Sequence, residues 1–151
     1  MKPNILSFPE VQYIVFCGDI HGDFIALVDK LRQTDIHDAL IVVVGDCGFG
    51  FEAPDYYEDT YQKILRHLHA YNLWIVMLRG NHDNPAYFNG EKRITYERWQ
   101  TISDYTILQA CNHNILCVGG AISIDRSMRL QWMDLRPERE AYWIDEAPVY
   151  N

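Results

Sequence analysis

Three apolar runs in the chain are each followed, directly or after one residue, by a glycine that precedes an aspartate or an asparagine. These endings are Gly18-Asp19, Gly45-Asp46 and Gly80-Asn81. A short apolar run that stops at a glycine is typical of a buried strand. Because open α/β folds place their ligands at the carboxyl ends of parallel strands, the three endings predict one polar site at one edge of a sheet.

Helical periodicity fills the segments between these runs. After Asp23, a candidate N-cap, apolar residues recur at i, i+3, i+4 and i+7 and predict a helix to about Gln33. A second helix is expected from Pro54, because residues 54–58 have the spacing of a capping box and an apolar face follows them. The two helices separate the three predicted strands.

The strands predicted at residues 11–17, 39–44 and 73–78 alternate with these helices in the order β-α-β-α-β. This order predicts parallel strands joined by right-handed crossovers, and therefore an α/β fold class. Two further strands, at residues 106–110 and 115–118, are expected to form a hairpin. No linker or internal repeat divides the chain, so residues 1–151 are expected to form a single domain.

The chain is acidic, with a formal net charge of −8 over 151 residues. This balance argues against a nucleic-acid surface or an anionic membrane as the main partner. No apolar run reaches the ~18–20 residues that a bilayer span needs. The four cysteines form no Cys-x-x-Cys pair, and Cys47 is expected to be structural. A reducing, cytoplasmic location is therefore favoured.

Asp19, His21, Asp46 and Asn81 form a mixed set of oxygen and nitrogen donors. Carboxylate and imidazole together suit Mn²⁺, Fe or Zn²⁺ better than Ca²⁺. Asp19 and His21 are separated by one residue, so both side chains can point to the same side at the end of a strand. Asp46 is able to bridge two ions, because a carboxylate offers several lone pairs. An aspartate after a glycine is, taken alone, more often a cap or turn residue, but three such endings together favour a metal site.

The spacing of these motifs is also that of a known family. Gly-Asp-Ile-His-Gly at residues 18–22, Gly-Asp at 45–46 and Gly-Asn-His-Asp at 80–83 resemble the calcineurin-like metallophosphoesterase superfamily. Residues 119–125, Gly-Gly-Ala-Ile-Ser-Ile-Asp, are similar to a stretch of its bacterial and phage members. The resemblance implies a four-layered sandwich and the hydrolysis of phosphomonoesters or phosphodiesters by a metal-bound hydroxide at a dinuclear site.

The resemblance also implies roles for the candidate ligands. Asp19 and His21 would belong to the first ion, Asp46 would bridge the two ions, and Asn81 would bind the second. The ions are divalent, with Mn²⁺ expected and Fe or Zn²⁺ as alternatives.

Two neighbouring residues would carry the chemistry if the resemblance holds. His82 would protonate the leaving oxygen or stabilise the transition state, and Asp83 would orient His82. Further along the chain, Arg126 and Arg129 are candidates for contacts with a substrate phosphate, with solvated surface charge as the alternative.

The chain departs from the family pattern in its second half. The family supplies a further lone histidine after Gly-Asn-His-Asp and a Gly-His-x-His motif near its end. After His82 this chain contains only His113, which is expected to be a surface turn residue, and no Gly-His-x-His. Three expected metal ligands are absent, so one bound ion is expected here instead of two. The sandwich is expected to be incomplete, as if truncated at its C-terminus.

Two functions therefore remain open. One is a metal-dependent hydrolase of phosphoesters. The other is a catalytically impaired, metal-binding remnant that acts as an interaction or regulatory module. In either case a sheet without its last strands leaves an open edge, so self-association that covers this edge is expected.

Overall fold

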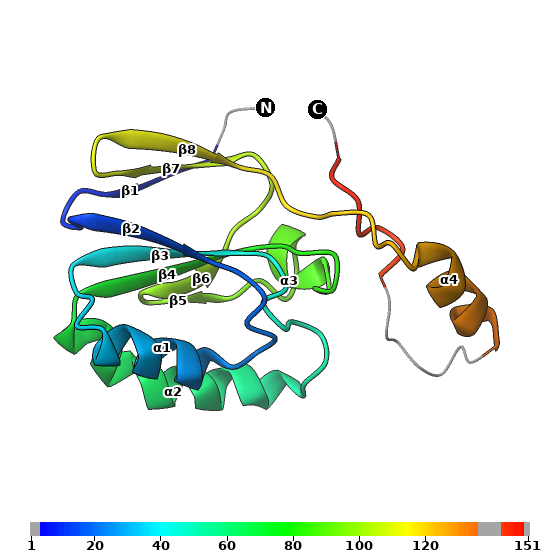
Figure 1. The fold of residues 1–151 in the computed structure, drawn as a ribbon, viewed down its shortest axis with the longest axis horizontal. Coiled ribbons are helices and arrows are strands. Elements are labelled where there is room, and N and C mark those ends of the chain that lie inside the picture. Colours follow the sequence, from blue (N-terminus) through cyan, green and yellow to red (C-terminus); the bar gives the residue numbers. More distant parts are fainter. Residues whose placement is uncertain (1–3, 136–142, 150–151) are drawn as a thin grey trace.

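The described part of the computed structural model, residues 4–135 and 143–149, is built in layers of strands and helices (Figure 1). A five-stranded sheet has the strand order β2-β3-β4-β6-β5, and a three-stranded sheet has the order β1-β7-β8. The elements in chain order are β1 (Ile5–Phe8), β2 (Tyr13–Cys17), α1 (Phe24–Gln33), β3 (Ala39–Val44), α2 (Pro54–Ala70), β4 (Leu73–Leu78), α3 (Ala86–Asn89), β5 (Thr95–Tyr96), β6 (Trp99–Thr101), β7 (Thr106–Ala110), β8 (His113–Cys117) and α4 (Arg126–Leu135).

Strands β2, β3 and β4 pair in parallel at the centre of the larger sheet. Helix α1 connects β2 to β3, and α2 connects β3 to β4, which confirms the predicted β-α-β-α-β core and the α/β fold class. The central strand β3 is buried on both faces: Ile41 and Val43 pack in the core between this sheet and the helices, and Leu40 and Val42 pack toward the second sheet. A continuous β-branched run suits such a doubly covered strand.

Helices α1 and α2 cover one face of the larger sheet (Figure 1). Asp23 caps α1 as expected, because its side chain accepts a hydrogen bond from the backbone N–H of Ala26 at 3.0 Å. The expected capping box of α2 does not form. The N-cap of α2 is Ala53, whose side chain has no hydrogen-bonding group, and the helix begins with Pro54, a residue suited to the first helical position.

The smaller sheet lies on the other face of the larger one (Figure 1). Strands β7 and β8 form the predicted hairpin, although β8 begins at His113, two residues before the expected start. Strand β1 pairs in parallel with β7. Side chains of both sheets, including Phe8 and Leu108 of the smaller sheet and Val76 of the larger one, fill the core between them. The architecture is therefore helix, sheet, sheet, and within the described residues no further layer covers the outer face of the smaller sheet.

Helix α4 follows the smaller sheet and projects from the side of the molecule (Figure 1). None of its residues is buried. Beyond it, residues 143–149 return to the edge at which β2, β3 and β4 end, where they contact Arg79 and His82. The sequence patterns above predicted neither the helix nor this return.

Candidate metal centre

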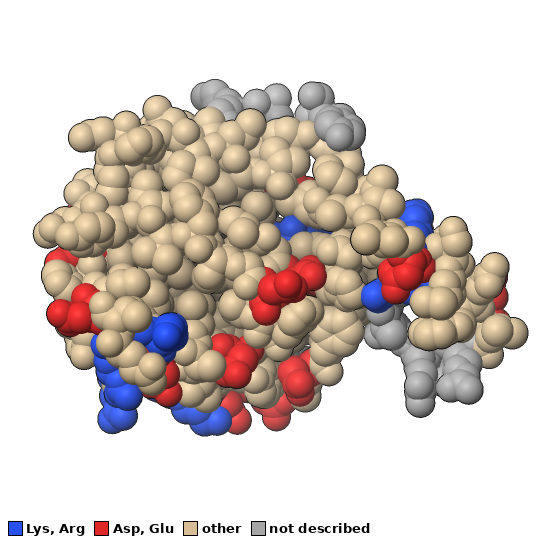
Figure 2. Space-filling model, viewed as in Figure 1, with Lys and Arg blue, Asp and Glu red and all other residues tan. Residues whose placement is uncertain are grey.

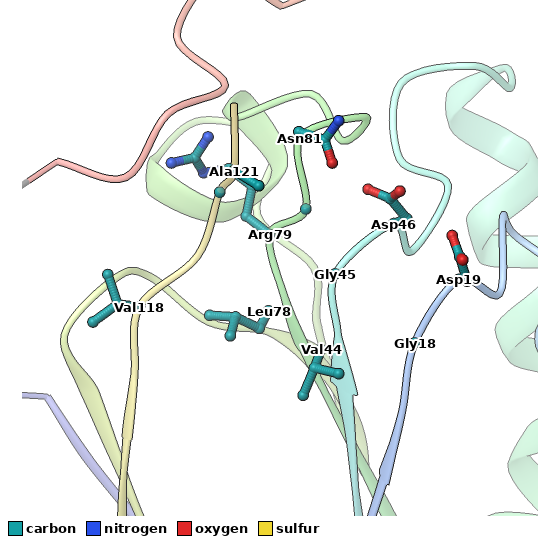
Figure 3. A pocket seen from close by; sticks show the side chains of 12 residues that line it. Gly18, Asp19, Val44, Gly45, Asp46, Leu78, Arg79, Asn81, Val118 and Ala121 are labelled. Atoms are coloured by element: carbon teal, nitrogen blue, oxygen red, sulfur yellow. The ribbon is translucent and has the colours of Figure 1, made fainter. Parts of the chain in front are cut away.

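The loops that follow β2, β3 and β4 meet at the carboxyl edge of the larger sheet and place Asp19, Asp46 and Asn81 near one another (Figure 3). The loops are joined through the backbone, because Asp19 N donates to Gly45 O at 3.3 Å and His21 N donates to Asp46 O at 3.0 Å. The loops converge because β2, β3 and β4 are parallel, so all three strands end at the same edge of the sheet.

Glycine is required where the second and third of these loops touch. A Cβ atom on Gly80 would lie 2.1 Å from the backbone nitrogen of Asp46, a distance at which the two loops would have to separate. Gly45 has a φ of 101°, in a region of backbone conformation that favours glycine. The glycines before Asp46 and Asn81 thus allow these two loops to approach each other closely.

Asp19, His21 and Asp46 form the cluster of candidate metal ligands. One donor atom from each lies within 4.8 Å of the others, and His21 Nε2 is 3.1 Å from Asp19 Oδ1. All three residues have a left-handed backbone, with φ values of 61°, 45° and 49°. This conformation is uncommon outside glycine and is concentrated at functional sites. Two carboxylates and an imidazole fit a transition-metal ion, and the side chains of Asp19 (79% exposed) and His21 (60%) leave it accessible from solvent.

A cavity lies at this edge of the sheet, and Asp19 and Asp46 line it. Asn81 lines the same cavity from the end of β4. Its side-chain nitrogen donates to Ser123 Oγ at 2.8 Å, and its oxygen lies on the side of Asp46 (Figure 3). The structure therefore brings all four sequence-predicted ligand residues to one edge of the sheet, three of them within mutual reach of a single ion.

Asp83 has a different contact from the one expected. Its buried carboxylate accepts four backbone N–H groups and faces the loop after β3, not the ring of His82. The donors are Cys47 (3.0 Å), Gly48 (2.8 Å), Phe49 (3.1 Å) and Gly80 (2.8 Å). Buried N–H groups require acceptors, and the carboxylate supplies them, so the expected orientation of His82 by Asp83 is corrected to a role in holding two loops together.

His82 is half-buried beside the candidate ligands. Its backbone nitrogen donates to Asp46 Oδ1 at 3.2 Å, and its carbonyl oxygen accepts from Trp143 Nε1 at 3.0 Å. The rings of His82 and His21 are 6.3 Å apart between centroids. His82 is thus fixed through its backbone, and its imidazole lies next to the ligand cluster.

The two arginines considered for substrate contacts are both engaged with carboxylates. Arg126 Nη1 lies 3.0 Å from the Oε1 atom of the buried Glu146, and Arg129 Nε lies 2.8 Å from Asp125 Oδ1. The hydrogen bond from Arg129 lowers the pKa of Asp125. Neither arginine lines the cavity. In this structure Arg126 pairs with Glu146, and its contact with a substrate phosphate stays a prediction.

A third arginine, which sequence reasoning missed, does have a place at the site. Arg79 follows Leu78, the last residue of β4, and is buried. Its guanidinium donates to the carbonyl oxygens of residues 145–147 at 2.8–3.2 Å. These bonds attach the returning C-terminal segment to the end of β4. The signal in the sequence is a charged residue directly between an apolar strand and a glycine, where a buried arginine needs several acceptors.

The cavity at this edge has a volume of about 520 Å³. Asp19, Asp46 and Asn81 form a polar side, and Val44, Leu78 and Val118 form an apolar side (Figure 3). Arg79 and Ala121 also line the cavity, whereas His21 does not. The cavity is open to solvent and is able to accommodate a ligand that has both a charged and an apolar part.

Other residues with metal-binding groups lie outside the cluster. His113 is exposed and is the first residue of β8, and its Nδ1 atom is 2.7 Å from Cys111 O. His37 contacts Asp38 in the loop before β3. Cys47 is completely buried and donates to Leu78 O at 3.2 Å. Burial raises the pKa of the Cys47 thiol well above its ordinary value, so it remains a protonated, structural cysteine.

Comparison with known proteins gives one match. The family model of the calcineurin-like phosphoesterases matches residues 13–149, a range that includes all three strand endings and the segment after β8. No curated protein and no solved structure matches the chain. Among the described residues, no helix combines the length and the apolar character needed to cross a membrane.

Proposed function

Because the chain belongs to the calcineurin-like phosphoesterase family, we propose that it hydrolyses phosphomonoesters or phosphodiesters with divalent metal ions at the edge formed by β2, β3 and β4. The observation that carries the proposal is the cluster of Asp19, His21 and Asp46, whose donor atoms lie within 4.8 Å of one another. Residues 1–151 act as one domain in this proposal. The four free cysteines fit a reducing compartment such as the cytoplasm.

Each candidate ligand has its own role in metal binding. Asp19 and His21 would hold the first ion, Asp46 would contact both ions, and Asn81 would bind the second. Mn²⁺ suits this mixed set of donors, with Fe and Zn²⁺ as alternatives. A metal ion bound there supplies a Lewis acid that neutralises charge on the phosphoryl group and activates water.

His82 donates the proton that the leaving oxygen needs. Its ring is next to that of His21, and its backbone bond to Asp46 keeps it beside the ligand cluster. Asp83 supports this arrangement from behind, because it holds the loop that carries Asp46. Asp83 is a positioning residue in this proposal, whereas His82 is the general acid.

The two sides of the cavity indicate how a substrate lies. The phosphate faces Asp19, Asp46 and Asn81, and an organic leaving group packs against Val44, Leu78 and Val118. This division favours an organic phosphoester over inorganic phosphate compounds, and leaves room for either a monoester or a diester.

A second candidate function is a metal-binding module without catalysis. It is favoured by the size of the ligand cluster, which among the described residues comprises two carboxylates and one imidazole. Asn81 adds only a neutral amide oxygen to the second ion position. With one ion held by Asp19, His21 and Asp46, less positive charge would be available to activate water than with two ions.

Hydrolysis of p-nitrophenyl phosphate and of bis(p-nitrophenyl) phosphate, each with added Mn²⁺, tests the proposal. Turnover that requires Mn²⁺, that is lost in Asp46→Asn and that is retained in Asp59→Asn supports it, because Asp59 is exposed on α2. Binding of Mn²⁺ without turnover of either ester supports the second candidate function, a metal-binding module without catalysis. A protein that neither binds Mn²⁺ nor hydrolyses the esters contradicts both functions.

A further inference from the structure

A chain of hydrogen bonds leads from Asn81 away from the cavity to a buried glutamate. Asn81 Nδ2 donates to Ser123 Oγ at 2.8 Å, and Ser123 Oγ is in turn hydrogen-bonded to Glu146 Oε2. The backbone nitrogen of Ser123 donates to Glu146 Oε1 at 3.1 Å. Ser123 is 7% exposed and Glu146 is 0% exposed, so water does not compete for the bonds between these two residues, whereas Asn81 is half-buried.

The direction of these bonds follows from the chemistry of the three groups. Glu146, ion-paired with Arg126, offers only acceptors to its neighbours. Ser123 has a single hydroxyl hydrogen and gives it to Glu146, so it offers Asn81 only a lone pair. Asn81 must therefore turn its NH₂ group toward Ser123. Its carbonyl oxygen is left facing the opposite way, on the side of Asp46 (Figure 3).

Glu146 is itself fixed to the end of β4. Its backbone oxygen accepts from Arg79 Nη1 at 3.1 Å and from the backbone N–H of Ala121 at 3.1 Å. Since Arg79 is two residues before Asn81, the glutamate and the amide are held by the same strand ending. The position of the Glu146 backbone relative to Asn81 is thus set by contacts with the buried Arg79 and with Ala121.

We infer that Ser123 and Glu146 are positioning residues that hold the Asn81 amide with its carbonyl oxygen toward the second ion position. The assignment of Asn81 as a metal ligand rests on the proposed function, whereas the orientation of the amide rests on the hydrogen bonds alone. Loss of such an outer partner costs 10–100-fold in metal affinity at well-studied sites. The same range is expected here for the ion that Asn81 contacts.

The orientation is tested first without metal, by NMR of the Asn81 side-chain amide in the full chain. In Ser123→Ala the two amide protons should exchange with water faster and move toward the shifts of a solvated asparagine. Ser127→Ala is the matched control, because Ser127 is exposed on α4, and it should leave both protons unchanged. An unchanged Asn81 amide in Ser123→Ala would overturn the inference, whether or not the protein binds metal or hydrolyses esters.

The consequence for metal is tested by titration with Mn²⁺ up to millimolar concentration, followed by electron paramagnetic resonance. Ser123→Ala and Glu146→Gln should weaken the looser ion about 10–100-fold and leave the tighter ion unchanged. In Glu146→Gln the new amide is able to donate to Ser123, which frees the hydroxyl hydrogen to attract the Asn81 oxygen. Glu146→Gln should therefore weaken the binding of the looser ion, even though glutamine has nearly the same shape as glutamate.

A double-variant comparison separates positioning from general damage. If Ser123 acts through Asn81, the Asn81→Ala/Ser123→Ala protein binds the looser ion as weakly as Asn81→Ala alone. A further loss in the double variant would contradict this route. If the wild-type chain binds only one ion at millimolar Mn²⁺, Asn81 is not a ligand and the metal part of the inference is wrong. The hydrolysis assay tests the proposed function separately.

Discussion

Asp83 Oδ1 accepts a hydrogen bond from the backbone N–H of Gly48 at 2.8 Å, and this contact joins the loop after β4 to the loop after β3. The same carboxylate also binds the N–H groups of Cys47, Phe49 and Gly80. The loop that it holds begins with Asp46, a candidate ligand. The geometry of the ligand cluster therefore depends on a buried carboxylate that does not itself face the cavity.

Replacing Asp83 by alanine should lower the free energy of unfolding by at least about 3 kcal/mol. Four N–H groups lose their acceptor, and each buried donor left unsatisfied costs about 1–3 kcal/mol. Urea unfolding measures the change. Asp59→Ala, on the exposed side of α2, should stay within about 0.5 kcal/mol of the wild type. Equal stability of the two variants would show that the carboxylate is dispensable.

Replacing His82 by alanine should lower kcat by about 10²–10⁴-fold while Mn²⁺ remains bound, because a general acid contributes a factor of this size. Steady-state kinetics beside a Mn²⁺ titration measures both effects. His37→Ala is the control, since His37 lies in the loop before β3 and contacts Asp38. Parallel loss of metal and turnover in His82→Ala would make His82 a ligand instead of an acid.

Dialysis against Mn²⁺ followed by elemental analysis should give close to one tightly bound ion per chain. In the proposed assignment Asp19, His21 and Asp46 would serve the first ion, while the second would depend on a shared carboxylate and a neutral amide. Two cations about 3.5–4 Å apart repel each other, and this ligand set has little negative charge to offset the repulsion. Removal of the ion by a chelator should abolish any hydrolysis. Two tightly held ions per chain would contradict this account.

The chain should self-associate through the smaller sheet. Strands β1, β7 and β8 contain no Asp, Glu, Lys or Arg, and Figure 2 shows no acidic or basic side chain over this layer on the face in view. Ile5 is 51% exposed and Leu116 is 61% exposed there. Uncharged strand edges and open apolar faces favour association.

Sedimentation velocity over a range of concentrations measures this association. Leu116→Lys should shift the protein toward monomer, because it places a charge in the apolar face. Ile25→Lys, on the exposed side of α1, should not do so. A monomer at the highest concentration of the wild type would count against the prediction.

Cys47 should resist alkylation in the native protein at pH 8. Its side chain is fully buried and burial raises its pKa well above the ordinary value, so the reactive thiolate is scarce. Burial also raises the pKa of Cys117, to about 11, and the same protection is expected there. Mass spectrometry after iodoacetamide treatment should show both cysteines modified only when the protein is unfolded. Rapid native labelling of Cys47 would instead make it an accessible thiol beside Asp46.

The sequence by itself determined the α/β class, the parallel core and the edge at which the polar residues gather. Strand and helix periodicities repeat within a few residues, and parallel strands necessarily end on the same side of a sheet. The place of Asp19, Asp46 and Asn81 could therefore be predicted without knowing any side-chain contact. The family resemblance, drawn from the same short motifs, was confirmed by the match over residues 13–149.

Only the tertiary structure decided which groups these residues contact. Asp83 was expected to face its neighbour His82, yet it binds N–H groups more than thirty residues earlier in the chain. Arg126 was considered for a phosphate and instead pairs with Glu146, and Arg79 binds residues 66–68 positions away. Such partners depend on how separate loops pack against each other, and hydrogen-bonding groups that are distant in sequence leave no local periodicity from which to predict them.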